Sequence, residues 1–254
     1  MPVWIERFAG IVALMVLFGL AGAAAQAQDS ARLNGASARL NGASATNIVT
    51  DRLEGKDLRR WNAIKTVVFA EDIEGQPLHP TLRRLWDQLE RSGHTIYIEM
   101  PGAGRAISNT AGAFHIERFD PEGLRHVAVI RLYPETIDRA YVGPNTARHE
   151  GFIPFQGLSK EERYVEVFGH EMAHAVDILG DLARARKVVE VVQRTNEMFL
   201  LHGKRYGYAN IGPEMQDRIA VRDAFLKELE EPAEVAEMLV WKEIRRGRGE
   251  RRGK

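Results

Sequence analysis

Short runs rich in β-branched and aromatic residues predict four strands in the first half of the chain. These runs cover residues 65–69, 95–100, 113–119 and 126–133. The last two are separated only by a short turn around residues 120–123, and such a connection favours an antiparallel pair. We therefore expect a small, twisted and mostly antiparallel sheet.

Helical spacing of hydrophobic residues predominates in the second half. It occurs once earlier, at residues 80–91, where Leu82, Leu85, Trp86 and Leu89 share one face. Later helices are predicted at 161–179, 182–201, 214–229 and 233–245, with Pro232 in the first turn of the last one, where a missing amide is tolerated. Residues 134–158 hold prolines and glycines and are expected to form a long loop near the helix that follows. Strands followed by helices indicate an α+β fold.

The ends of the chain differ from its centre. Residues 1–27 combine an early Arg7, an apolar run at 11–25 and a small-x-small motif, which is typical of a bacterial-type signal peptide; an uncleaved membrane anchor is the alternative. Residues 28–50 include a heptapeptide repeated without change and are predicted to be a low-complexity linker. The domain is then expected at 51–246, followed by a basic, disordered tail at 247–254.

The composition limits the kinds of binding and catalytic site that the chain can form. The chain has 254 residues, a formal net charge of zero and no cysteine. Neutral charge argues against a role in binding nucleic acid, and we interpret the basic C-terminal end as a solvated terminus. The absence of cysteine excludes disulfides, thiolate zinc sites and thiol catalysis, so histidine and carboxylate side chains are the strong metal ligands that remain.

The pentapeptide His170-Glu171-Met172-Ala173-His174 lies inside the helix predicted at 161–179. Histidines at positions i and i+4 project from one helical face toward a common point, which suits a zinc ion with an open position for water. Glu171 is placed to act as general base and take a proton from that water. Ser159 and Glu162 form a capping box pattern, which supports a real helix start. The motif resembles the HExxH signature of the zincin metallopeptidases.

A third ligand has to come from elsewhere in the chain. The metzincin pattern HExxHxxGxxH fails, because Asp177 and Gly180 stand where glycine and histidine are required. A glutamate on a later helix, as in gluzincins, fits better. Glu231, Glu234 and Glu237 are the candidates, in an acidic segment around the start of the last predicted helix.

Residues 170–177, His-Glu-Met-Ala-His-Ala-Val-Asp, resemble the active helix of the anthrax lethal factor type of metallopeptidase. The resemblance implies a zincin-like fold with Glu234 as third ligand and Glu237 as second-shell carboxylate. In that family the two glutamates are four residues apart, whereas here they are three apart. The family also places a tyrosine in a Tyr-Gly context near the metal, which implies Tyr206 as a catalytic oxyanion donor, with Tyr208 as second choice.

Two further expectations concern the surroundings of the metal. Asp177 follows His170 by two helical turns and is expected to orient a ligand from the second shell; a solvated carboxylate is the alternative. The strand at 126–133 is expected at the edge of the sheet, where an extended peptide could pair with it. The remaining histidines have no ligand spacing; they are His79, His94, His115, His126, His149 and His202.

Taken together, the sequence predicts an exported, zinc-dependent metallopeptidase, periplasmic or secreted, with a peptide or protein substrate. Contact with a membrane is expected only through an uncleaved N-terminal anchor, and the oligomeric state stays open. Two alternatives keep the same metal residues. One is a zincin amidase acting on cell-wall peptides, and the other is a zinc-stabilised, non-catalytic envelope or binding protein in which Glu171 has no chemical role.

Overall fold

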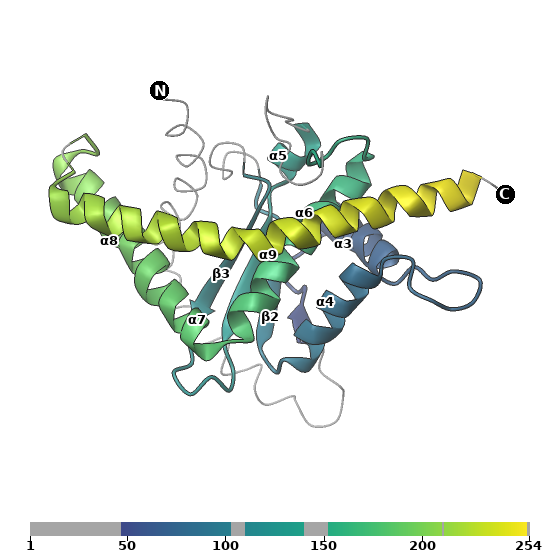
Figure 1. Ribbon diagram of the computed structural model, residues 1–254, viewed down its shortest axis with the longest axis horizontal. Coiled ribbons are helices and arrows are strands. Elements are labelled where there is room, and N and C mark those ends of the chain that lie inside the picture. Colours follow the sequence, from purple (N-terminus) through teal and green to yellow (C-terminus); the bar gives the residue numbers. More distant parts are fainter. Residues whose placement is uncertain (1–46, 103–109, 140–151, 210, 253–254) are drawn as a thin grey trace.

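A four-stranded sheet lies at the centre of the fold, in the order β1-β2-β4-β3 (Figure 1). Its strands are β1 (Ile48–Val49), β2 (Thr95–Glu99), β3 (Gly112–Arg118) and β4 (Val127–Leu132). β1 pairs parallel with β2, β2 pairs parallel with β4, and β3 pairs antiparallel with β4. The α+β class is as predicted, but the sheet is mixed and not mostly antiparallel. Only β3 and β4 are joined by a short turn, whereas helices connect β1 to β2 and permit a parallel return.

The computed structural model describes residues 47–102, 110–139, 152–209 and 211–252. The signal peptide expected at 1–27 and most of the linker expected at 28–50 lie outside these residues. β1 occupies the last part of that expected linker, so the folded domain begins by Ile48. None of the helices in the described segments is long and apolar enough to cross a bilayer.

Three helices pack together beside the sheet: α3 (Gly55–Val68), α4 (Pro80–Arg91) and α6 (Lys160–Leu179). α4, α6, β2, β3 and β4 match their predicted positions to within about one residue. The strand predicted at 65–69 is wrong, because these residues complete α3. Trp61, Ile64 and Val68 are its buried residues, and their helical spacing outweighs the strand propensity of the β-branched run.

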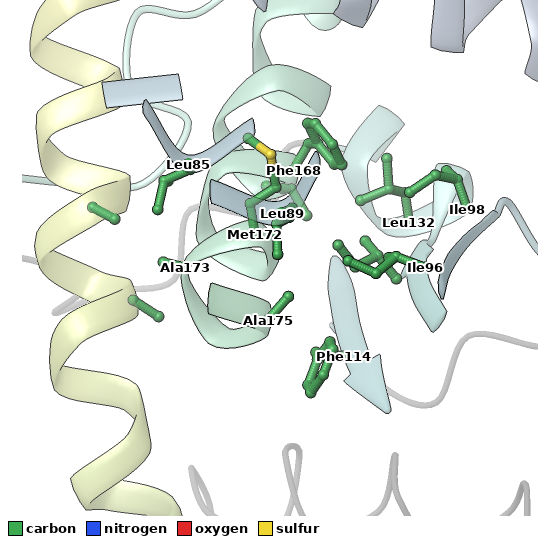
Figure 2. Close-up of a cluster of buried hydrophobic side chains, with 14 of the residues drawn as sticks. Leu85, Leu89, Ile96, Ile98, Phe114, Leu132, Phe168, Met172, Ala173 and Ala175 are labelled. Carbon is green, nitrogen blue, oxygen red and sulfur yellow. The ribbon is translucent and has the colours of Figure 1, made fainter. Parts of the chain in front are cut away.

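The hydrophobic core lies between α6, α4 and the sheet (Figure 2). Phe168 and Met172 of α6 are fully buried and belong to the same hydrophobic cluster as Leu85 and Leu89 of α4. Ile96, Ile98, Phe114 and Leu132 approach the same cluster from the strands. This packing fixes one face of α6 against the sheet, so the position of its histidines is set by the core.

The connection from β4 to α6 includes α5 (Pro134–Arg139), within what was predicted to be a loop. After α6 the chain continues through α7 (Leu182–Lys187), a π-helical segment η2 (Val188–Gln193) and α8 (Arg194–Tyr206). This run contains the helix predicted at 182–201.

The last element is α9 (Pro213–Arg252), a single helix of 40 residues that crosses the whole molecule (Figure 1). The two helices predicted at 214–229 and 233–245 are therefore one, and Pro232 lies inside it. Proline at an interior position removes one backbone hydrogen bond but does not have to end the helix when packing holds both sides. α6 and α9 share an extensive contact. α9 also continues through residues 247–252, which were expected to be disordered.

Candidate metal centre

Two histidines on α6 point toward one position. The helix begins with a complete capping box, in which the Ser159 side chain accepts from the Glu162 backbone and the Glu162 side chain accepts from the Ser159 backbone. Ten residues further on, the Nε2 atoms of His170 and His174 lie 3.1 Å apart. The predicted convergence of the two imidazoles is therefore present in the fold.

Glu230 of α9 completes a group of three side chains that could hold a metal ion. Its carboxylate oxygens lie 3.4 Å from Nε2 of His170 and 3.5 Å from Nε2 of His174. Four-coordinate zinc with bonds of about 2.0 to 2.1 Å requires ligand atoms about 3.3 Å apart. The three side chains thus offer the donor types of a zinc site, and each histidine nitrogen has a Glu230 oxygen at close to this distance. Among the described residues, no other three His, Asp or Glu side chains form such a group.

The carboxylate that the structure groups with the two histidines is that of Glu230, and not that of Glu234, which the sequence favoured as third ligand. Glu234 lies one helical turn further along α9, is partly exposed and is not in the group, and Glu231 is exposed. The prediction failed because it began a new helix at Pro232. Treating α9 as continuous would have placed Glu230, Glu234 and Glu237 on one face, since they are spaced by four and three residues.

Glu237 lies on the other side of His170. Its Oε2 is 3.1 Å from Nδ1 of His170, so the ring can donate through Nδ1 and present Nε2 to the ligand group. Burial disfavours a charge on His170, but the hydrogen bonds to Glu230 and Glu237 outweigh it and raise the His170 pKa well above its usual range. Burial also opposes the charge on Glu230, yet the two histidines hold the pKa of that carboxyl well below its usual range.

A second buried carboxylate, Glu166, supports this side of the centre. It is fully buried on α6, one turn before His170, and accepts a hydrogen bond from the Phe155 backbone at 3.0 Å. Burial and the nearby Glu237 charge raise the pKa of Glu166 well above its ordinary value. Phe155 has a φ of 65°, the only positive φ of a non-glycine residue in the described segments. Sequence reasoning did not identify Glu166.

Glu171 points from α6 toward the start of β3. Its side chain is 4% exposed, and burial raises its pKa to about 7 although His170 and His174 act in the opposite direction. A Cβ atom built on Gly112 would lie 2.5 Å from Oε1 of Glu171 and 2.7 Å from Cγ1 of Val167. β3 therefore passes this close to Glu171 because residue 112 has no Cβ, and a larger residue would require the strand or the carboxylate to shift.

Tyr133 is a buried polar residue, within electrostatic range of Glu171, that the sequence did not suggest. It follows β4, is 1% exposed, and its hydroxyl has no hydrogen-bond partner among the described residues. Burial raises its pKa to about 12; the Arg131 charge acts against this shift and the Glu171 charge adds to it. Oε2 of Glu171 is likewise buried without a partner in the described segments. Each of these two buried polar atoms requires an explanation.

The structure does not bring Tyr206 or Asp177 to the metal centre. Tyr206 is 54% exposed at the end of α8 and packs against His202, and Tyr208 is 49% exposed. The nearby start of α9 is 17 residues before Glu230, or about 25 Å along the helix. Asp177 accepts from Nη1 of Arg184 through both oxygens at 2.5 Å, so it links α6 to α7.

The other histidines lie outside the ligand group. His94 and His126 stack on each other in the core, His115 is on β3, His79 precedes α4 and His202 is on α8. His149 lies outside the described residues. The chain matches no protein-family model, no curated protein and no solved structure, so its function is inferred from this geometry.

Proposed function

We propose that this chain is a metallopeptidase that uses His170, His174 and Glu230 to hold a zinc ion and Glu171 as general base. The convergence of the two histidine Nε2 atoms, 3.1 Å apart, on the Glu230 carboxylate, which places one oxygen 3.4 Å from His170 and the other 3.5 Å from His174, carries this proposal. When bound, the ion would polarise a substrate carbonyl and lower the pKa of a water. With Glu230 as ligand, the next glutamate on that face, Glu234, is four residues away, the separation found in the lethal factor type of family.

The environment of the Glu171 side chain favours a catalytic role over a structural one. Its carboxylate is buried beside the ligands, has an oxygen without a partner in the described segments and has a pKa near neutrality. A base with these properties can take a proton from water and deliver it to a leaving amine. Tyr133 is the candidate donor for the developing oxyanion, because its hydroxyl has no hydrogen-bond partner among the described residues and the Glu171 charge acts on it.

The substrate is proposed to bind in extended form along β3. The sequence-based expectation that the strand at 126–133 lies at the edge is wrong, because β4 lies between β2 and β3. β3 is the last strand in the order, and its Gly112 end lies against Glu171. A peptide added to β3 would therefore reach the general base through backbone pairing.

The test compares the zinc-loaded full chain with its Glu171→Gln variant on an unstructured protein, casein, and on a mixed peptide library. We expect hydrolysis by the native chain and a fall of about 10² to 10⁴-fold in the variant, with zinc content unchanged. Glu161→Gln, an exposed glutamate in the first turn of α6, is the matched control and should retain activity.

Three other results would oppose the proposal. A native chain that binds zinc but cleaves nothing would favour the non-catalytic binding protein. A chain that cleaves only cell-wall peptides would favour the amidase. A chain that binds no metal would exclude both the site and the activity.

A further inference from the structure

Gln193, at the end of the π-helical segment η2, contacts the edge strand. Its Nε2 donates to the Ile116 carbonyl at 2.9 Å and lies 3.2 Å from each ring nitrogen of His115. Gln193 is half-buried, and its Oε1 is buried without a hydrogen-bond partner among the described residues. Single π-helical turns occur frequently at functional sites, because they rotate the side chains that follow. Here the segment aims an amide at a strand that leads to Glu171.

The register of β3 shows which of its backbone groups face away from the sheet. The Tyr133 backbone donates to the Ala111 carbonyl, so residue 111 pairs toward β4. Because direction alternates along a strand, Ala113 and His115 also pair toward β4, whereas Gly112, Phe114 and Ile116 present their N–H and C=O groups at the free edge. Of these three residues, Ile116 is the one bonded to another described element, through Gln193.

The usable edge therefore has two ends. It begins at Gly112, against Glu171, and it meets Gln193 four residues later at Ile116. At about 3.3 Å per residue this stretch is about 13 Å long. A peptide that pairs with Gly112 and Phe114 has room for about four residues in all, opposite positions 112–115, before the Gln193 side chain takes the next carbonyl.

We propose that Gln193 is a specificity-determining residue that ends the peptide-binding edge at Ile116 and restricts the site to segments close to a chain terminus. This inference rests on the proposed peptidase function. For a peptide running antiparallel to β3, as β4 does on its other side, the restricted side is the N-terminal one. The substrate class is therefore short peptides, or protein ends, with few residues before the bond that is cleaved.

A binding experiment tests the length limit set by Gln193 without requiring turnover. Fluorescein-labelled peptides that share a C-terminal half and carry two to eight residues before the scissile bond are titrated onto the zinc-loaded Glu171→Gln chain by anisotropy. We expect Kd to rise at least 10-fold once about four residues are exceeded, and this rise to disappear in Glu171→Gln/Gln193→Ala. Glu190→Ala, an exposed residue of the same segment, is the control and should keep the length dependence.

Turnover assays distinguish a failure of this inference from a failure of the proposed peptidase function. The same peptides are given to the native chain and to Gln193→Ala, with Gln193→Ser as a second variant if the first fails to fold. A length limit on kcat/KM that is relieved in either variant supports the proposal. Cleavage with no length limit, or with a limit that both variants retain, overturns it and leaves the peptidase intact. Absence of any cleavage removes both.

Discussion

The Nδ1 atom of His170 lies 3.1 Å from Oε2 of Glu237, which joins a ligand on α6 to a carboxylate on α9. This contact orients the imidazole and increases its basicity as a metal ligand. Glu237→Gln should therefore weaken zinc binding by about 10 to 100-fold, measured by competition with a chromophoric chelator. Zinc affinity equal to that of the native chain would mean that Glu237 only fills space.

Replacement of Glu230 should show which glutamate of α9 binds the metal. Glu230→Gln removes a charged donor from the group of three, and the purified chain should contain far less than one zinc by elemental analysis. Glu234→Gln, one turn further along the helix, is the matched variant and should retain the metal. If Glu234→Gln loses zinc and Glu230→Gln keeps it, the ligand assignment is wrong.

Gly112→Ala should reduce activity without removing the metal. The new methyl group would lie 2.5 Å from Oε1 of Glu171, so this carboxylate or the strand has to move. A displacement of about 1 Å in a general base can cost about 100-fold in rate. Zinc content and kcat are measured together. Gly212→Ala serves as the control because its added Cβ meets nothing within 4 Å, and equal activity in the two variants would contradict this account.

Tyr133→Phe should lower activity without lowering stability. The substitution removes a buried hydroxyl that has no partner among the described residues, so the free energy of unfolding should stay constant or rise by about 1 kcal/mol. Turnover should fall if the hydroxyl serves the oxyanion. Tyr164→Phe provides the comparison: its hydroxyl bonds Asp138 at 2.9 Å, so its loss should cost about 1 kcal/mol and leave kcat unaffected. Unchanged turnover in Tyr133→Phe would exclude Tyr133 from the chemistry.

Acidification should destabilise the stacked pair His94 and His126. Nδ1 of His94 accepts from the His126 backbone, and Nδ1 of His126 accepts from the Asp120 backbone, so both rings need to be neutral. Burial lowers the pKa of both rings in the folded state, with the His94 charge adding to the effect at His126. The unfolded chain therefore binds more protons, and stability falls as pH decreases below about 6.5.

Thermal unfolding between pH 7.5 and pH 5 measures this effect. Because carboxylates such as Glu171 titrate with the opposite sign, the informative quantity is the difference between native and His94→Asn chains. The variant should have the lower Tm at pH 7.5 and a smaller loss on acidification. Parallel curves for the two chains would show that the pair contributes no pH dependence.

Local signals in the sequence predicted α6 well, and contacts between distant elements decided what the sequence missed. The capping box at Ser159 and the buried face of Phe168 and Met172 act within one helix, so they could be recognised directly. The third ligand depended on whether Pro232 starts a helix or lies inside one, and packing of α9 on α6 determines that. The same holds for α3, where burial of Trp61 and Ile64 overrides the strand propensity of residues 65–69.

The remaining misses come from tertiary arrangement. Tyr206 was assigned from a resemblance, but its ring ends on the surface of α8, while Tyr133, which follows β4, is the buried tyrosine whose pKa the Glu171 charge affects. The position of β4 inside the sheet follows from its parallel pairing with β2, which no local pattern encodes. Asp177 lies on the same helical face as His170, but its carboxylate accepts a hydrogen bond from Arg184 of α7.

The separation of the ligands along the chain has a thermodynamic consequence. His174 and Glu230 are 56 residues apart, so an ion held by both closes a loop of that length in a protein that has no cysteine. In the chain-entropy treatment of a cross-link, such a closure restricts the unfolded state by about 4 kcal/mol. The ion would thus act as a cross-link between α6 and α9, and chelation should lower the free energy of unfolding although the apolar contact between the two helices remains.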